Sequence, residues 1–207
     1  LSLFSAFANT RGNSADGDTS WLASARRGNL ELLVDWLDKS YGSPKYDDAY
    51  VRIGRRLSSS AAVYAGAHRS QDDVSLTDNE EVARSDIDTN YLWTRLDVAH
   101  SASLRSSTLL TYVSSDRDKS ERNTESDVSV GFLDYSQEMR KYVLHSDFAY
   151  DGDGGTLMEF GFEGEFADSH YHSAALVDRG PIAALFGNPE VEAFDINTDP
   201  SGWSGGA

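Results

Sequence analysis

The chain has no cysteine among its 207 residues, which excludes disulfide bonds and thiolate metal sites. It also lacks any apolar run close to the roughly 20 residues that a membrane-spanning helix needs, and its mean hydropathy is −0.49. Basic residues are scarce: 18 lysines and arginines stand against 34 aspartates and glutamates, for a formal net charge of −16. Because a nucleic-acid-binding surface has to neutralise phosphates, this balance argues against nucleic acid as a partner.

Sequence motifs of catalysis are absent as well. The chain has no G-x-S-x-G elbow, no H-E-x-x-H helix motif and no Walker loop. The segment DGDGG at 151–155 lacks the glycine spacing of a calcium-binding EF-hand loop and has Phe162 where that loop needs its final glutamate, so we interpret it as a tight turn. We therefore expect no catalytic residues, no metal, no cofactor and no enzymatic activity.

The most informative pattern that is present lies at 156–172, where apolar and acidic side chains alternate. Met158, Phe160, Phe162 and Phe166 share one parity, and Glu159, Glu163 and Glu165 share the other. Strict alternation is the period of a β-strand, because successive side chains point to opposite sides of a sheet. A soluble sandwich could use the aromatic side as its core, whereas a membrane barrel could turn it towards lipid and keep the acids in a wet lumen. Alternation alone favours neither.

The same alternation, interrupted by polar segments, divides the whole chain into strands and the joints between them. The pattern predicts eight strands, at 1–9, 19–27, 46–57, 61–72, 89–100, 105–116, 130–150 and 156–175. Short polar joints at 11–18, 58–60, 101–104 and 151–155 alternate with long acidic joints at 28–45, 73–88, 117–129 and 176–207. Short turns at one end and long loops at the other are typical of an outer-membrane barrel. Helical spacing of apolar residues at 29–39 predicts a short helix inside one loop.

We therefore expect an all-β fold, an antiparallel up-and-down meander whose eight or so strands are part of a larger transmembrane β-barrel. Residues 1–175 would supply the strands and their loops, and 176–207 would be an extracellular loop. At 46–57, Arg52 and Arg56 share a parity opposite Val51 and Ile53, so both arginines are expected on the polar, lumen-facing side.

Several segments resemble one family. The runs SWLASARRGNLELL (20–33) and PKYDDAYVRIGRRLSSSAAVYAGAHRSQDDVSL (44–76) resemble the early barrel of TonB-dependent outer-membrane receptors, just after the plug domain. The runs TNYLWTRLDVAHSASLRSSTLLTYVSSDRD (89–118) and GTLMEFGFEGEFADSHYH (155–172) are similar to later strands of that barrel. The resemblance covers most of the chain, to about residue 175. Neither a plug domain nor a C-terminal strand with a final aromatic residue is recognisable in it.

This resemblance implies import of a scarce nutrient, such as a ferric siderophore, across the outer membrane of a Gram-negative cell. It implies as partners the outer-membrane lipid, the plug and remaining strands of the same receptor, TonB acting through that plug, and a small-molecule cargo such as a metal chelate. Our candidate ligand contacts are Trp36, Arg52, Arg56, His170, Tyr171 and His172. Each has a plainer interpretation: Trp36 packs a loop helix, the arginines pair with acids of the lumen or plug, and the SHYH segment is a polar strand end.

Two alternatives stay open. One is a small outer-membrane barrel, structural or adhesive, closed by the same eight strands, which requires the first and last strands to pair. The other is a soluble ligand-binding β-barrel, which requires an apolar interior. The receptor hypothesis instead predicts that Phe148, Phe160 and Phe162 face lipid, and it fails if these rings are buried between two packed sheets. A chain with an apolar outer face and unpaired edges is not expected to fold stably in water.

Overall fold

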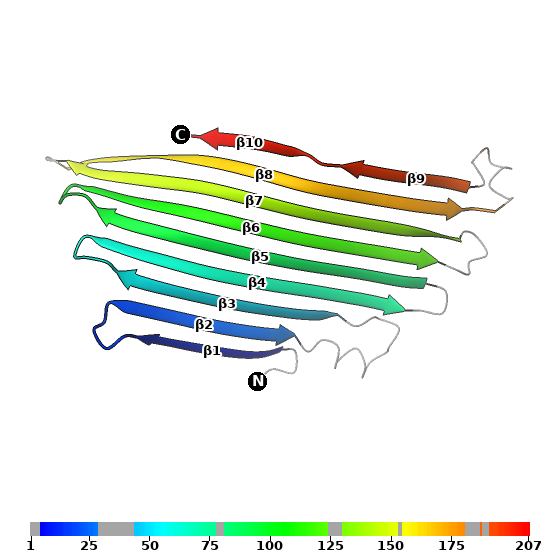
Figure 1. Cartoon of the computed structure of the whole chain (residues 1–207), viewed down its shortest axis with the longest axis horizontal. Coiled ribbons are helices and arrows are strands. Elements are labelled where there is room, and N and C mark those ends of the chain that lie inside the picture. The colour runs from blue at the N-terminus through cyan, green and yellow to red at the C-terminus, as the bar shows by residue number, and fades with distance from the viewer. Residues whose placement is uncertain are drawn as a thin grey trace.

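The computed structural model describes residues 5–28, 44–77, 81–123, 130–152, 155–180, 187 and 191–207. These form a single antiparallel sheet (Figure 1). Its strands are β1 (Ser5–Asn13), β2 (Thr19–Gly28), β3 (Lys45–Arg56), β4 (Ala61–Thr77), β5 (Glu81–Ala99), β6 (Leu104–Asn123), β7 (Val130–Gly152), β8 (Thr156–Asp178), β9 (Val191–Thr198) and β10 (Ser201–Gly206). Each strand from β1 to β8 pairs with the next along the chain, and β9 and β10 both pair with β8. The predicted up-and-down meander is therefore confirmed.

The predicted helix at 29–39 lies outside the described residues. The four short polar joints are confirmed as the connections at one end of the sheet, on the left in Figure 1. Two of the expected long joints are shorter than predicted, because β4 runs to Thr77, β5 begins at Glu81 and β6 runs to Asn123. The added ends of β5 and β6 carry polar or charged side chains on both sides, and the added end of β4 has only Val74 and Leu76 alternating with polar residues. These segments therefore show little of the apolar alternation by which a strand is recognised.

The expected loop at 176–207 is also corrected, because it contains the end of β8 together with β9 and β10. The last two elements are one strand with an interruption: Thr198 pairs with Tyr171 and Ser201 pairs with Asp168, so the register on β8 does not change. Across the gap, the Ser169 N–H still donates to the Pro200 carbonyl oxygen at 3.0 Å. Proline has no N–H to donate, and an edge strand is where a sheet tolerates it. The sheet is thus a meander of nine strand positions.

The sheet has no hydrophobic core. Among the described residues Ala175 is the one buried apolar side chain, and all extensive contacts between strands are between neighbours in the sheet. The solvent-accessible area is 14088 Å², whereas a compact protein of 22.7 kDa exposes about 9,500 Å². No second layer covers Phe160 or Phe162 in the part of the chain that the structure describes, and both are exposed. The described strands therefore do not form a β-sandwich.

The two edges of the sheet do not meet. Among the described strands, β1 pairs with β2 alone, and the far side of β8 is occupied by β9 and β10. A barrel closed by the first eight strands, which the small-barrel alternative requires, is therefore not formed.

Four contacts between a glycine and an aromatic ring link the first five strands side by side. In each, the ring of an aromatic residue on the next strand lies over a glycine: Trp21 over Gly12, Tyr46 over Gly28, Tyr64 over Gly54 and Trp93 over Gly66. In three of the four the glycine and the aromatic residue are direct strand partners, and Gly28 follows the last residue of β2 that pairs with β3. A ring placed across a glycine covers exposed backbone and helps to fix strand register. A side chain at any of these glycines would occupy the space of the ring.

Candidate functional site

The pairing register gives the sheet two chemically different faces. The apolar face carries Trp21, Val51, Ile53, Leu92, Leu96, Leu110, Tyr142, Leu144, Phe160, Phe162 and Trp203, all of them exposed. The polar face carries Arg11, Arg52, Arg56, Arg95, Asp97, Arg105, Asp147, Glu159, Glu163 and Glu165. The parity that the sequence predicts for these strands is confirmed.

Aromatic rings border the apolar face at two levels. The upper level is the one farther from the short turns. There, Tyr112, Tyr142, Phe166 and Trp203 are paired across four neighbouring strands, with successive ring centroids 5.0, 6.4 and 4.7 Å apart. At the lower level, near the short turns, Phe148 stacks on Phe160 with centroids 5.1 Å apart, and Tyr150 lies beside them. We call the surface between these two rows the apolar band.

The height of the apolar band follows from the length of strand between the two rows. Tyr142 and Tyr150 are eight residues apart on β7, which is about 27 Å along a strand. A strand tilted by about 40° would then rise about 21 Å between the rows, close to the band of about 25 Å that outer-membrane barrels turn towards lipid. Beyond the upper row the same face becomes charged, with Arg69, Asp88 and Arg140.

The polar face opposite the apolar band separates its charges. At the level of the apolar band, the charged side chains on β1 to β4 are Arg11, Arg52 and Arg56. Arg26, Asp48 and Asp72 lie on the same face, beyond the level of the upper aromatic row. On β7 and β8 its charged side chains are mainly Asp147, Glu159, Glu163 and Glu165. Lys141 and Glu165 form an ion pair at 2.6 Å, and His145 lies 3.2 Å from Glu163. The result is a positive sector and a negative sector across one wall.

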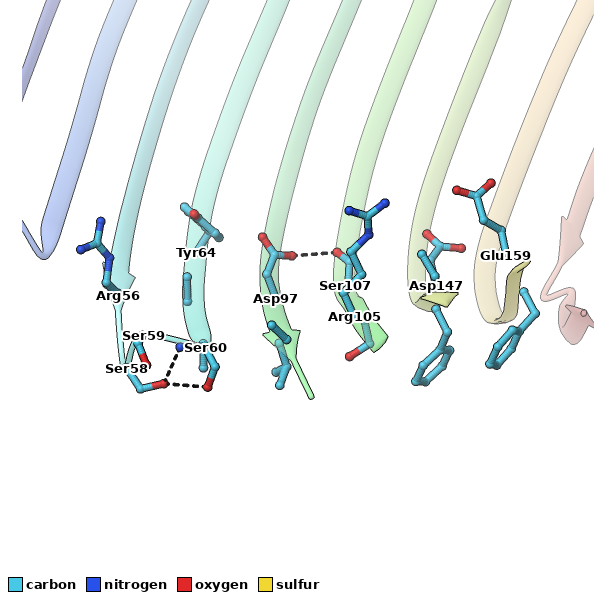
Figure 2. A pocket seen from close by; sticks show the side chains of 18 residues that line it. Arg56, Ser58, Ser59, Ser60, Tyr64, Asp97, Arg105, Ser107, Asp147 and Glu159 are labelled. Atoms are coloured by element: carbon cyan, nitrogen blue, oxygen red, sulfur yellow. Dashed lines mark hydrogen bonds between the residues drawn. The ribbon is translucent and has the colours of Figure 1, made fainter. Parts of the chain in front are cut away.

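A hollow of about 740 Å³ lies at the short-turn end of this wall. In Figure 2, Arg56, Tyr64, Asp97, Asp147 and Glu159 form a row with one side chain from each of five strands. Ser107 donates to Asp97 at 2.9 Å, and Arg95 pairs with the same carboxylate at 3.1 Å. Both signs of charge line the hollow, so it has no clear preference for a cation or an anion.

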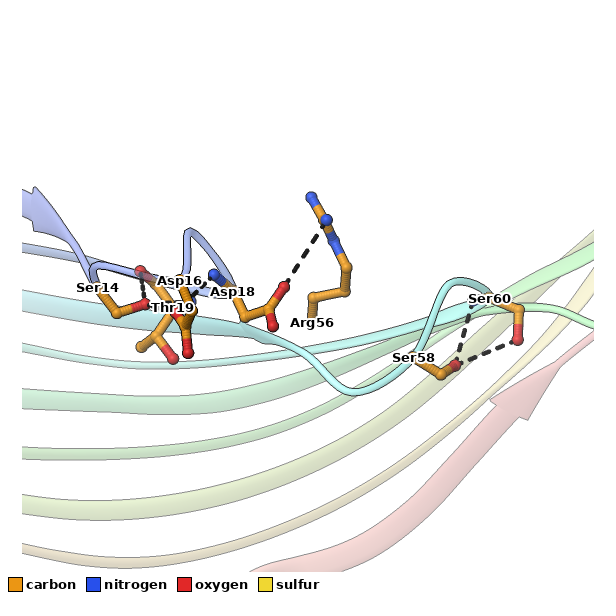
Figure 3. Close-up of polar contacts among 7 residues, drawn as sticks. All are labelled: Ser14, Asp16, Asp18, Thr19, Arg56, Ser58 and Ser60. Atoms are coloured by element: carbon orange, nitrogen blue, oxygen red, sulfur yellow. Dashed lines mark hydrogen bonds and ion pairs between the residues drawn. The ribbon is translucent and has the colours of Figure 1, made fainter.

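The turn between β1 and β2 is held by its own side chains (Figure 3). The Thr19 N–H donates to Ser14 Oγ at 2.9 Å, and Gly17 supplies the positive φ of 74° that the turn requires. Hydrogen bonds from the Ser14 hydroxyl and from the Asp18 N–H lower the pKa of Asp16. Asp18 pairs with Arg56 at 3.8 Å, which connects this turn to the end of β3. These contacts give the turn a structural role, which is to join β1 to β2 and to hold the end of β3.

The structure divides the sequence-predicted ligand contacts. Trp36 lies outside the described residues. Arg52 and Arg56 lie on the polar face of β3, as predicted, whereas Tyr171 lies about five strands away, or about 24 Å. Tyr171 also faces the polar side and accepts a hydrogen bond from Gln137 at 3.2 Å. The six candidates therefore do not form one site.

The two histidines lie on the face opposite Tyr171, the face that carries Phe160 and Phe162. His170 is hydrogen-bonded to Asp199, and His172 lies 3.6 Å from Asp195. Both acids come from the interrupted edge strand, so the histidines attach that strand to β8. No cluster of three or more metal-binding side chains occurs among the described residues.

The attachment by His170 is expected to depend on pH. His170 lies four residues beyond Phe166, outside the apolar band, and its hydrogen bond to Asp199 raises its pKa, with a further contribution from Glu138. A raised histidine pKa stabilises the folded state below the ordinary value of about 6.5, and this contribution is lost as pH rises through the folded pKa. We expect hydrogen exchange at 199–203 to be faster at pH 8.5 than at pH 5.5, beyond the intrinsic pH effect. Asp199→Asn should remove this excess, and an unchanged excess would contradict the assignment.

Comparison with known proteins gives no match: no protein-family model, no curated protein and no solved structure matches this chain. No helix in the part of the chain that the structure describes is long and apolar enough to cross a membrane.

Proposed function

We propose that this chain forms part of the wall of an outer-membrane β-barrel, with the apolar band against lipid and the polar face towards the lumen. The observation that carries the proposal is the band itself: an exposed apolar surface, bordered by two aromatic rows about one membrane thickness apart, on a sheet without a second layer. A soluble protein seldom leaves so large an apolar surface uncovered. In a bilayer the same surface is stabilising.

The proposed barrel is that of a TonB-dependent receptor importing a scarce nutrient such as a ferric siderophore. One observation supports a large barrel: nine strand positions leave two free edges among the described residues. Barrels of the proposed class have about 22 strands around a plugged lumen, which would leave room for further strands at both edges. The segments that resemble this family support the class. In this proposal the polar face contacts the plug and the cargo, and TonB acts through the plug.

Tryptophan quenching tests the orientation of the wall. Trp21 and Trp203 lie on the apolar face and Trp93 on the polar face. We expect bromine atoms on lipid acyl chains to quench variants of the full chain that retain Trp21 or Trp203 as their single tryptophan. A variant that retains Trp93 should instead be quenched by iodide in water. Equal quenching of all three by either reagent, or none by brominated lipid, would reject the proposal.

The class of barrel has a separate test in the gene that encodes this chain. A receptor of this class would encode a plug domain before the chain and further amphipathic strands after it. An open reading frame with neither would leave a barrel wall without the proposed import function.

A further inference from the structure

Gly66 stands at the centre of a patch on the polar face where three strands meet. The pairing register surrounds it with eight same-face neighbours on β3, β4 and β5. We call these nine residues the Gly66 patch: Tyr50, Arg52, Gly54, Tyr64, Gly66, His68, Tyr91, Trp93 and Arg95. Five of them carry rings and two carry guanidinium groups, whereas none is acidic.

The indole of Trp93 lies across Gly66. Three of its atoms, Cε2, Nε1 and Cζ2, are 2.5–2.7 Å from the position that a Cβ of residue 66 would take. Trp93 is half-buried, so part of its ring faces solvent on the polar side. Its indole N–H has no acceptor among the described residues, although tryptophan normally finds one when it is buried. The ring therefore offers a flat surface and an unused donor.

Arg52 lies on the other side of the same glycine. Its Cα pairs with that of Gly66, which pairs in turn with Trp93, so Arg52 and Trp93 are two strands or about 9.6 Å apart. Within the described part of the chain the exposed Arg52 has no ion pair, hydrogen bond or aromatic partner. Glycine places no side chain between the two donors. The indole of Trp93 fills that space and brings its N–H over Gly66, between β5 and β3, so an acceptor from outside can approach it together with the Arg52 guanidinium.

The neighbouring charges leave Arg52 uncompensated. Asp48 on the same strand is bound to Arg26 at 2.6 Å. Arg95 is already engaged, because it pairs with Asp97 at 3.1 Å and lies 4.7 Å from the centroid of the Tyr64 ring. The patch thus carries a net positive charge, two donors without acceptors, and rings around them. A guanidinium binds carboxylate or phosphate through strong charge-assisted hydrogen bonds.

We propose that the Gly66 patch binds a small anion carried on a ring, with its acidic group between Arg52 and the Trp93 N–H and its ring against the aromatic side chains. A sugar acid and an aromatic acid share this chemistry. The inference deepens the proposed function, because it names the ligand class that the lumen-facing wall takes. It can fail while the orientation of the wall is upheld, since the two are measured by different experiments.

Calorimetric titration of the full chain in detergent micelles tests the proposal, with glucuronate and benzoate as the two acids and glucose and benzyl alcohol as their neutral analogues. We expect at least one acid to bind saturably, and at least about tenfold more tightly than its neutral analogue. Arg52→Gln should weaken that binding at least about tenfold. The acid that binds shows whether the ring of the ligand is a sugar ring or an aromatic ring.

Arg105→Gln is the matched control, because it removes the same charge from the same face outside the patch and should change affinity less than about twofold. Trp93→Phe retains a ring but loses the N–H, and should weaken the acid more than its neutral analogue. Circular dichroism of each variant establishes that the sheet is retained. The proposal is overturned if neither acid binds, if acid and neutral analogue bind equally, or if the Arg52 and Arg105 variants lose affinity equally.

Discussion

Replacing Leu144 by arginine is expected to destabilise the chain in lipid vesicles by about 1–3 kcal/mol, because a basic side chain on the lipid face of a barrel costs about 2–4 kcal/mol at the bilayer midplane and about 0–1 near the interfaces, and Leu144 lies between these levels. Leu144 lies inside the apolar band, two residues from the upper aromatic row, and is 42% exposed. Nothing in the sheet buries it, so in water the same substitution would cost little. Equilibrium denaturant titration of both proteins in the same vesicles measures the difference.

Val143→Arg is the matched control for this prediction. Val143 is the adjacent residue, so its side chain points to the polar face, and its strand partner there is Glu165. A guanidinium at this position would lie beside a carboxylate and in the lumen, where we expect a loss below about 1 kcal/mol. Equal losses at the two positions, or a neutral effect of Leu144→Arg, would show that the apolar band does not face lipid.

The two faces of the sheet could be predicted from the sequence, because the side-chain period of a strand is two. The parity of Arg52 against Val51, and of Glu163 against Phe162, determines which side of a strand each occupies once the strand is identified. The same rule separates His170 from Tyr171, so a single ligand set containing both was inconsistent with their own spacing.

The ends of the strands could not be predicted, because they depend on hydrogen bonding that composition does not report. Beyond the apolar band, β5 and β6 pair through charged residues on both faces, for example Asp86 with Asp118. In the last strand, Pro200 and three nearby glycines favour a loop, yet the ladder with β8 continues on both sides of the interruption. In both cases neighbouring strands stabilise a conformation that the local sequence does not favour.

The Gly66 patch was missed for a further reason. Arg52 and Trp93 are 41 positions apart in the sequence, and only the register of two successive strand pairs brings them to either side of Gly66. A shift of one residue in either pair would move a partner to the opposite face. The sequence did contain one indication of the patch. Gly54 lies on the same side of its strand as Tyr50, and Gly66 lies on the same side of its strand as Tyr64.

Replacing Gly54 by valine tests whether the contacts between glycines and aromatic rings hold the register of neighbouring strands. The new Cβ would lie 2.6 Å from Cδ1 and 2.8 Å from Cε1 of Tyr64, so the ring has to move, which disturbs its contact with Arg95. Forcing side chains apart in this way costs about 1–3 kcal/mol. The stiffer backbone of valine offsets about 0.5–1 kcal/mol of that cost. We expect a net loss of stability in denaturant titrations of the vesicle-bound chain.

A double-mutant cycle with Tyr64→Ala distinguishes loss of the contact between Gly54 and the Tyr64 ring from a general intolerance of valine. Removing the ring should remove most of the cost of Gly54→Val. Gly164→Val is the matched control: it lies on β8 with no heavy atom within 4 Å of the position of its Cβ. There the gain in backbone stiffness should dominate, leaving stability unchanged or up to about 1 kcal/mol higher. If Gly54→Val and Gly164→Val behaved alike, or if the cycle gave no coupling, the rings would merely cover the glycines, and the register would have to be held by the backbone ladder and the turns alone.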